Sequence, residues 1–224
     1  MKTILALETS TEIASVALLH NNEQKSVELS GVNTHSHGLI PAIHELLEAF
    51  NIGLNQIDLI AFGCGPGAFT GVRTACGVVQ GLAFGLNIPV IAIGSLQSQA
   101  QAAFEQFAVD ECICVLDARM GEVYWSHLKF QNGRWHELAP QRLARIEEVM
   151  TYADQTERLV VFGTQLEWQG SRTARLAMPH AKYSLKIAAV TTVENYLEAQ
   201  DAQPVYLRNK VALTTAERLQ ASSE

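Results

Sequence analysis

The chain has 224 residues and a formal net charge of −7, and 48% of its residues are hydrophobic. This composition can fill one large core or two small ones and is not typical of a disordered protein. Proteins that grip nucleic-acid phosphates by themselves usually carry a basic face, whereas the 16 lysines and arginines here form no run. We therefore expect any role in RNA chemistry to be indirect.

Membrane insertion and secretion are not indicated. No segment has the roughly 18 consecutive apolar residues of a membrane span, and Glu8 interrupts an apolar start that is too short for a signal peptide. Cys64, Cys76, Cys112 and Cys114 form no CxxC pair, which favours buried free thiols in a reducing compartment. We expect a soluble, cytoplasmic protein.

The first half begins with three strands joined by short turns and continues with alternating helices and strands. Apolar runs and helical spacing predict strands at 2–7, 13–20 and 24–29, a helix at 37–50, a strand at 57–63, a helix at 72–86, a strand at 89–93 and a helix at 95–107. Hairpin-linked strands followed by crossovers predict a mixed sheet with helices on its faces.

The same order of elements then begins again. We predict strands at 112–117, 122–130 and 135–142, a helix at 146–153, a strand at 158–163, a helical or mixed segment at 165–177 and a helix at 183–199. The sequence therefore predicts an α/β protein of two related subdomains, each a mixed sheet flanked by helices. Their predicted ranges are 1–107 and 108–224, the second being smaller.

Glu8, Thr9 and Ser10 follow the first strand. A carboxylate at a strand end can orient a metal-bound water, and hydroxyls in a tight turn can hold phosphate oxygens. An ordinary polar hairpin has the same composition and is the stronger interpretation of these three residues alone.

A glycine-rich turn at 63–71 separates a strand from a helix, so its backbone N–H groups are candidates for an anion site. Gly65, Gly67 and Thr70 are its candidate contacts. A P-loop would need Lys-Ser/Thr where Val72 and Arg73 stand, and a dinucleotide fingerprint would need an acidic residue about 20 positions later. A tight turn that needs glycine conformations remains the alternative.

Gly77, Gly81 and Gly85 recur at four-residue spacing on one face of the second predicted helix. Each costs an isolated helix about 0.8–1.0 kcal/mol relative to alanine, so close approach by another element is expected to compensate. That element is either this chain's own sheet or a neighbouring helix of it, or else a helix of another subunit, and the spacing alone favours neither interpretation.

The remaining polar candidates are weaker. His37 and His44 are about 10.5 Å apart along a helix axis and cannot share one ion, and His35 precedes the helix. Asp117 and Arg119 end the strand that opens the second half, and a turn holding an Asp–Arg pair explains them without chemistry.

Five segments resemble the TsaB (YeaZ) family. They are ILALETST, HSHGLIPAIHELL, GPGAFTGVRTACGVVQGLA, LDARMGEVY and PVYLRNKVA, which span nearly the whole chain in the family's order. The resemblance implies a ribonuclease-H-like fold of the actin-like ATPase and sugar kinase superfamily. It also implies relatedness to TsaD, the subunit that transfers a threonylcarbamoyl group to tRNA. The metal-binding HxxxH of TsaD is not matched, because Leu39 follows His35 by four positions and Ile40 precedes His44 by four.

What the resemblance implies is a non-catalytic scaffold that binds and activates TsaD, with TsaE as an ATPase partner. The transfer runs from threonylcarbamoyl-adenylate to the adenosine beside the anticodon, so tRNA is contacted through the complex. ATP is used by the complex, and no cofactor or metal is expected on this chain alone. Without TsaD, such chains are expected to form homodimers through the same surface.

The two N-terminal helices form that surface by the same resemblance. The expected interface residues are Leu39, Ile43, Leu47, Arg73, Thr74, Gly77, Val78, Gly81 and Gly85. Glu8, Thr9, Ser10, Gly65, Gly67 and Thr70 are candidates for a nucleotide or phosphate contact at a subunit junction. Asp117, Arg119 and Arg208 are further candidates without an assigned role.

The sequence leaves two alternative functions open. An ATP-dependent phosphotransferase or ATPase is suggested by Glu8-Thr9-Ser10 with the glycine-rich turn. A metalloprotease is suggested only by the histidines and by older naming of the superfamily, and no protease nucleophile or zinc ligand set supports it.

Overall fold

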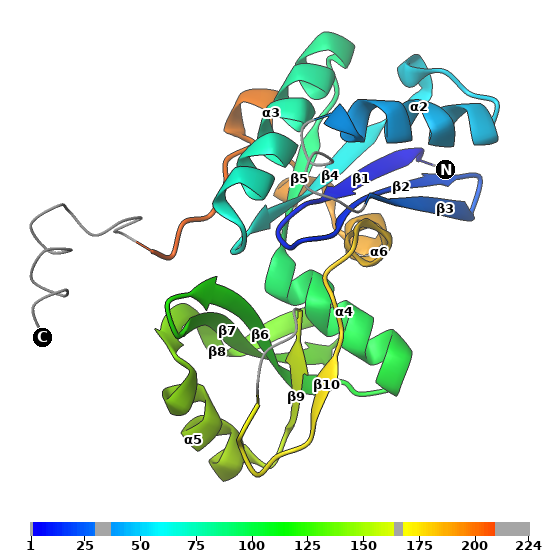
Figure 1. Ribbon diagram of the computed structural model, residues 1–224. Coiled ribbons are helices and arrows are strands. Elements are labelled where there is room, and N and C mark those ends of the chain that lie inside the picture. Colours follow the sequence, from blue (N-terminus) through cyan, green and yellow to red (C-terminus); the bar gives the residue numbers. More distant parts are fainter. Residues whose placement is uncertain (1, 30–36, 164–167, 209–224) are drawn as a thin grey trace, which may run out of the picture.

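The computed structural model describes residues 2–29, 37–163 and 168–208. Figure 1 shows two α/β units, one above the other, with a long helix between them. The alternation of strands and helices predicted from the sequence is confirmed, and the protein is of the α/β class, with two mixed sheets flanked by helices.

The first sheet has five strands in the order β3-β2-β1-β4-β5. Its strands are β1 (Ile4–Glu8), β2 (Ala14–His20), β3 (Glu23–Leu29), β4 (Leu59–Gly65) and β5 (Val90–Gly94). The first three are antiparallel, and β1, β4 and β5 are parallel. Helices α2 (Leu39–Ala49) and α3 (Phe69–Leu86) follow β3 and β4, with a short 3-10 turn at Leu54–Gln56.

The second sheet repeats this order as β8-β7-β6-β9-β10. Its strands are β6 (Glu111–Arg119), β7 (Glu122–Gln131), β8 (Arg134–Arg145), β9 (Leu159–Phe162) and β10 (Ala174–Leu176). Helices α4 (Ser95–Phe107), α5 (Ile146–Thr156) and α6 (Ala181–Val190) complete the layers, and 3-10 turns lie at Val193–Asn195 and Ala199–Asp201. The repeated strand order confirms the internal similarity of the two halves.

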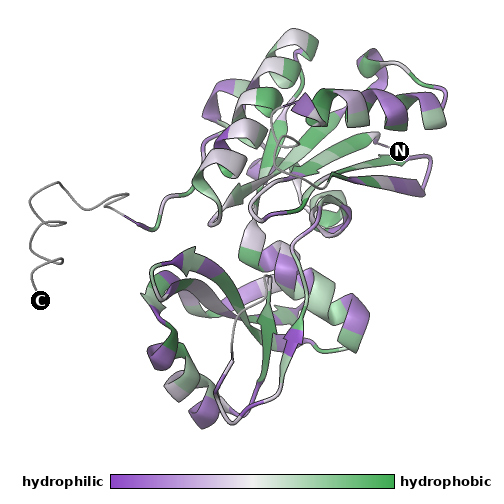
Figure 2. Ribbon diagram, in the orientation of Figure 1, coloured by the Kyte–Doolittle hydropathy of each residue, from purple (hydrophilic) through white to green (hydrophobic). Residues whose placement is uncertain are grey.

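Burial on both faces explains the continuous apolar run of β1. Leu5 and Leu7 pack toward α2 and α3, whereas Ile4 and Ala6 pack toward α6. Successive side chains of a strand alternate between faces, so a central strand covered on both sides is apolar throughout. Figure 2 shows this concentration of hydrophobic residues in the strands of both sheets.

The strands of the first sheet are all complete before the second sheet begins, but the helices that cover the two sheets cross between them. Helix α4 packs on the second sheet, where Leu96 and Ala100 share a core cluster with Cys114. Helix α6 returns to the first sheet, and the segment after it pairs Leu197 with Val90 at the edge of β5. The predicted boundary at residue 107 falls in the turn between α4 and β6, but segments on both sides of it contribute to both units.

The helical or mixed segment predicted at 165–177 and the helix predicted at 183–199 differ in part from the structure. The described part of 165–177 contains Gly170 and then the short strand β10, which pairs with β9. The predicted helix at 183–199 ends at Val190, because the β-branched run 190–193 has low helix propensity. Among the described helices, none is long and apolar enough to cross a membrane.

Candidate functional site

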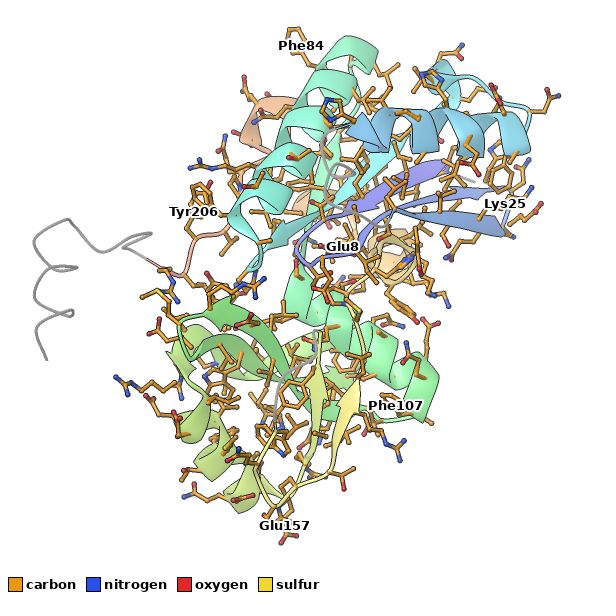
Figure 3. All side chains as sticks on the ribbon, in the orientation of Figure 1. Glu8, Lys25, Phe84, Phe107, Glu157 and Tyr206 are labelled. Carbon is orange, nitrogen blue, oxygen red and sulfur yellow. The ribbon has the colours of Figure 1, made fainter. Side chains whose placement is uncertain are left out.

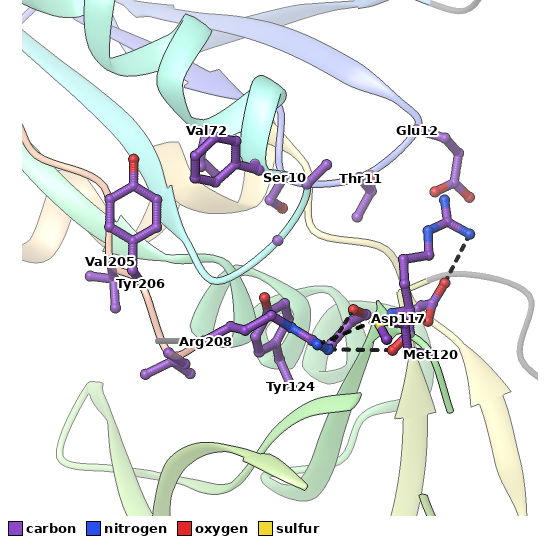
Figure 4. Close-up of a pocket in the computed structure, with 16 residues that line it drawn as sticks. Ser10, Thr11, Glu12, Val72, Asp117, Met120, Tyr124, Val205, Tyr206 and Arg208 are labelled. Atoms are coloured by element: carbon purple, nitrogen blue, oxygen red, sulfur yellow. Dashed lines mark hydrogen bonds and ion pairs between the residues drawn. The ribbon is translucent and has the colours of Figure 1, made fainter. Parts of the chain in front are cut away.

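A cleft of about 250 Å³ lies between the two units. Its walls are the turn after β1, the start of α3, the turn between β6 and β7, and the C-terminal segment (Figure 4). The lining residues are Ser10, Thr11, Glu12, Gly67, Ala68, Phe69, Val72, Asp117, Ala118, Arg119, Met120, Tyr124, Val205, Tyr206, Leu207 and Arg208. Because hairpins at equivalent places in the two sheets face each other, the repeated topology itself creates this cleft.

The cleft brings together sequence-predicted residues from distant parts of the chain. Ser10, Gly67, Asp117, Arg119 and Arg208 all line it. They come from four segments: Ser10 and Gly67 were predicted together as a nucleotide or phosphate contact, whereas Asp117, Arg119 and Arg208 had no assigned role. Their common location is a property of the fold that no local pattern in the sequence expresses.

Glu8 and Thr9 do not line the cleft, although they were predicted beside Ser10. The Glu8 carboxylate is fully buried, accepts a hydrogen bond from the Ser10 backbone N–H at 2.9 Å and lies 3.4 Å from the Ser95 hydroxyl. Burial raises the pKa of Glu8, which favours the uncharged form. Thr9 donates its hydroxyl to the Gly71 carbonyl at 2.8 Å. Both side chains therefore support the first sheet and the start of α3.

The glycine-rich turn is shaped by close approach of these neighbours. A Cβ on Gly63 would collide with the Glu8 carboxylate, and one on Gly67 would collide with Ser10. Gly65 has a φ of +99°, and a Cβ there would lie 3.2 Å from the Val205 carbonyl oxygen. The turn thus requires glycine for packing, which accounts for its composition without a ligand.

The two arginines that line the cleft are each paired with a carboxylate of this chain. The guanidinium of Arg119 lies 3.0 Å from the Asp117 carboxylate, which also accepts the Arg119 backbone N–H at 2.7 Å. Arg208 lies 2.6 Å from the Glu122 carboxylate and donates to the Ala118 carbonyl at 2.9 Å. Arg208 therefore fastens the C-terminal segment to the second unit across the cleft, a role that its sequence position did not reveal.

Three residues predicted for a partner interface are instead part of this chain's core. Leu39, Ile43 and Leu47 are 0–3% exposed and pack against the first sheet. The helical spacing that marked them identifies the buried face of α2. Any surface that α2 offers to a partner consists of its other face, where Ile40 is 41% exposed.

The glycine row of α3 is open. Outside the helix's own backbone, a Cβ added at Gly77, Gly81 or Gly85 would find no atom of the described residues within 4 Å, so the interpretation that these glycines pack against the chain's own sheet is wrong. Phe84 beside them is 83% exposed and points away from the body of the protein (Figure 3). A row without side chains and an exposed aromatic ring thus share one helix.

The other predicted residues of α3 divide between surface and core. Val78 is half-buried against the core under α2 and α3. Thr74 donates its hydroxyl to the Thr70 carbonyl at 2.9 Å. Arg73 is exposed, and its Nε donates to the Tyr206 hydroxyl at 2.6 Å.

The described histidines do not form a metal site. His37 and His44 are both exposed, while His35 lies outside the described residues. In the part of the chain that the structure describes, no three His, Cys, Asp or Glu residues are grouped so that they could hold a metal ion.

Three aromatic residues that line the cleft were not predicted as site residues: Phe69, Tyr124 and Tyr206. The exposed ring of Phe69 lies 5.5 Å from that of Tyr206. An aromatic residue directly after a glycine-rich turn was the available signal for Phe69. Tyr206 had none, because its position depends on the return of the chain to α3.

The chain is similar to proteins of known name over nearly its full length. Residues 19–218 match the TsaD family, described as tRNA N6-adenosine threonylcarbamoyltransferase. The tRNA threonylcarbamoyladenosine biosynthesis protein TsaB of Haemophilus influenzae is 38% identical, over 93% of this chain and 94% of that protein. Its Escherichia coli counterpart is 34% identical, over 93% and 96%.

A solved structure leads to the same family. YeaZ from Pseudomonas aeruginosa has a TM-score of 0.82 and 36% identity, covering 92% of this chain and 100% of that chain. The chain therefore belongs to the TsaB (YeaZ) family of tRNA threonylcarbamoyladenosine biosynthesis proteins.

Proposed function

We propose that this chain is a non-catalytic subunit that binds and activates TsaD, with TsaE as the third partner. The reaction that it would assist is the transfer of the threonylcarbamoyl group from its adenylate to the tRNA adenosine next to the anticodon. In this proposal ATP is consumed by the complex, the chain holds no cofactor by itself, and tRNA is reached through the complex in the cytoplasm.

The open glycine row of α3 is the observation that carries the proposal. Three of the four glycines of this 18-residue helix form the row and weaken the helix, and no part of the described chain uses the space above them. A helix of another subunit can approach such a row more closely than it can approach side chains, and the resulting packing would offset the cost. The same row offers a homodimer contact when TsaD is absent.

The cleft supports a scaffold more than an enzyme. Its cations, Arg119 and Arg208, each form an ion pair with a carboxylate of the same chain. The described lining of the cleft therefore offers a phosphate no unpaired cation. The carboxylate predicted to orient a metal-bound water, Glu8, is buried away from the cavity.

Substitutions in the row test the proposal. Gly77→Leu and Gly81→Leu place a side chain where a partner helix would lie, and both should abolish binding to TsaD and stimulation of transfer while the monomer stays folded. Ala189→Leu, at another exposed small residue, on α6, is the control and should bind normally. Normal binding and stimulation by both glycine variants would reject the interface.

An ATP-dependent phosphotransferase is the second candidate, because a cavity of about 250 Å³ lies between the two units of this fold. Calorimetry of the isolated chain with Mg-ATP separates the two functions. Binding at sub-millimolar affinity would favour the phosphotransferase, whereas no heat would remove it. Stoichiometric metal in the purified chain would be needed to revive a metalloprotease.

A further inference from the structure

Arg73 extends the glycine row by one step toward the start of α3. Phe69, Arg73, Gly77, Gly81 and Gly85 follow one another at four-residue spacing, so they form a single ridge position on the helix. Side chains of a helix lean toward its N-terminus, which places the Arg73 side chain over Phe69. A helix lying in the glycine row would therefore meet the Arg73 side chain at one end.

The guanidinium of Arg73 is held in a fixed position. Its central carbon lies 3.6 Å from the centre of the Phe69 ring and 5.4 Å from that of Tyr206. Its Nε donates to the Tyr206 hydroxyl at 2.6 Å. Stacking and this hydrogen bond fix the plane of the group, which leaves the donors on its two terminal nitrogens for another acceptor.

Arg73 has no ion-pair partner among the described residues. Arg119, Arg158, Arg172 and Arg208 each pair with a carboxylate of this chain, and the chain carries seven more carboxylates than cations. Arg134, Arg142, Arg145 and Arg175 also lack an ion pair within the described part of the chain. Arg73 differs from them because two aromatic rings and a hydrogen bond hold its guanidinium, which suits it to bind an external carboxylate.

We infer that Arg73, clamped by Phe69 and Tyr206, is a preorganised anchor for a carboxylate side chain on the partner that packs on α3. The inference rests on the proposed function and adds the chemistry of the contact. A fixed guanidinium can bind a carboxylate through two parallel hydrogen bonds with little further loss of side-chain freedom. The first turn of α3 also favours a negative charge, because its free backbone N–H groups carry partial positive charge.

Three substitutions dissect the anchor. Arg73→Met removes the charge and keeps an apolar stem over Phe69, Arg73→Lys keeps the charge without the planar fork, and Tyr206→Phe removes only the hydroxyl acceptor. The control is Arg175→Met, because Arg175 is another exposed arginine over a ring, 4.9 Å from the centre of Phe107. Circular dichroism and unfolding curves establish that each variant is folded.

The measurement is the Kd for TsaD of the same organism at about 50 and 300 mM salt. We expect Arg73→Met to weaken binding by about tenfold or more, with a flatter salt dependence, and Arg73→Lys to recover only part of the loss. Arg175→Met should leave the Kd unchanged. Arg73→Glu should then be rescued by replacing one particular Asp or Glu of TsaD with Arg.

The outcomes separate the inference from the proposed function. Normal affinity of Arg73→Met together with loss of binding by Gly77→Leu would overturn the anchor and leave the interface intact. Normal affinity of Gly77→Leu would overturn the interface itself. Failure of every charge reversal in TsaD to rescue Arg73→Glu would also overturn the carboxylate assignment. A weakened affinity for tRNA with an unchanged affinity for TsaD would mean that Arg73 serves a phosphate instead.

Discussion

Replacing the three open glycines of α3 with alanine should stabilise the free protein and weaken its complex. Glycine is less favourable than alanine by about 0.8–1.0 kcal/mol in an exposed helix interior. Among residues 2–29, 37–163 and 168–208, a new Cβ at Gly77, Gly81 or Gly85 meets no atom within 4 Å outside its own helix backbone, so the free energy of unfolding of the triple variant should be higher by about 2.5–3 kcal/mol. For a chain of this size, that corresponds to a rise in Tm of about 5–12 °C.

Urea unfolding of the free protein, at two protein concentrations, measures this gain without a contribution from self-association. An unchanged m-value would establish that the denaturation midpoint reports stability alone. Gly63→Ala is the matched control, because its Cβ collides with the Glu8 carboxylate and the same substitution should there destabilise the protein. In binding to TsaD, the triple variant should be weaker than the wild type, since three methyl groups occupy the proposed contact row.

A triple variant no more stable than the wild type at low protein concentration would refute this reasoning. It would mean that something in the monomer already fills the space above the row. Stabilisation with fully preserved binding to TsaD would refute the interface while leaving the helix energetics correct.

Further predictions concern buried titratable groups. Burial raises the pKa of Glu8 above its ordinary 4.5, so the folded state keeps a proton that the unfolded chain releases. The free energy of unfolding should therefore fall as pH rises above about 4.5. Glu8→Gln should flatten this part of a plot of the urea unfolding midpoint against pH. Burial lowers the pKa of His180 from 6.5 to about 4, so the free energy of unfolding should fall as pH drops from 6.5 toward 4. The imidazole of His180 also caps α6 by accepting the Lys182 backbone N–H. His180→Asn keeps a side chain that can cap the helix and should remove this pH dependence. Burial raises the pKa of the Cys64 thiol to about 12, so iodoacetamide should leave Cys64 unmodified in the native protein and label it after unfolding.

The strand and helix pattern could be predicted because most elements carry strong local signals. Helix α4 was placed at its observed ends, and β1 was identified by an apolar run that two-sided burial requires. The early end of α6 was missed because the apolar residues after Val190 continue a helical spacing while serving another purpose. Leu197 instead pairs with Val90 at the edge of the first sheet.

The candidate site was predicted in pieces but not as an arrangement. Ser10, Asp117 and Arg208 were each candidates in the sequence. That they lie in one cleft depends on two distant hairpins, one from each sheet, that face each other. Helical spacing also could not distinguish the two faces of α2 and α3. It selected apolar positions such as Ile43, which is buried, and left the packing of Gly81 undecided until the surroundings of the helix were known.

The crossing of the chain between the sheets has a consequence for synthesis on the ribosome. The five strands of the first sheet have all been synthesised once residue 94 is added, yet one face of that sheet stays uncovered until α6 at 181–190 is made, and Ala202 completes the core on its other face. At about 5–20 residues per second, this interval of roughly 90–110 residues lasts about 5–20 s. During that time Ile4, Leu59 and Ile91 lack the α6 residues that cover them in the folded protein, so we expect the first unit to reach its final packing only after most of the second has been synthesised.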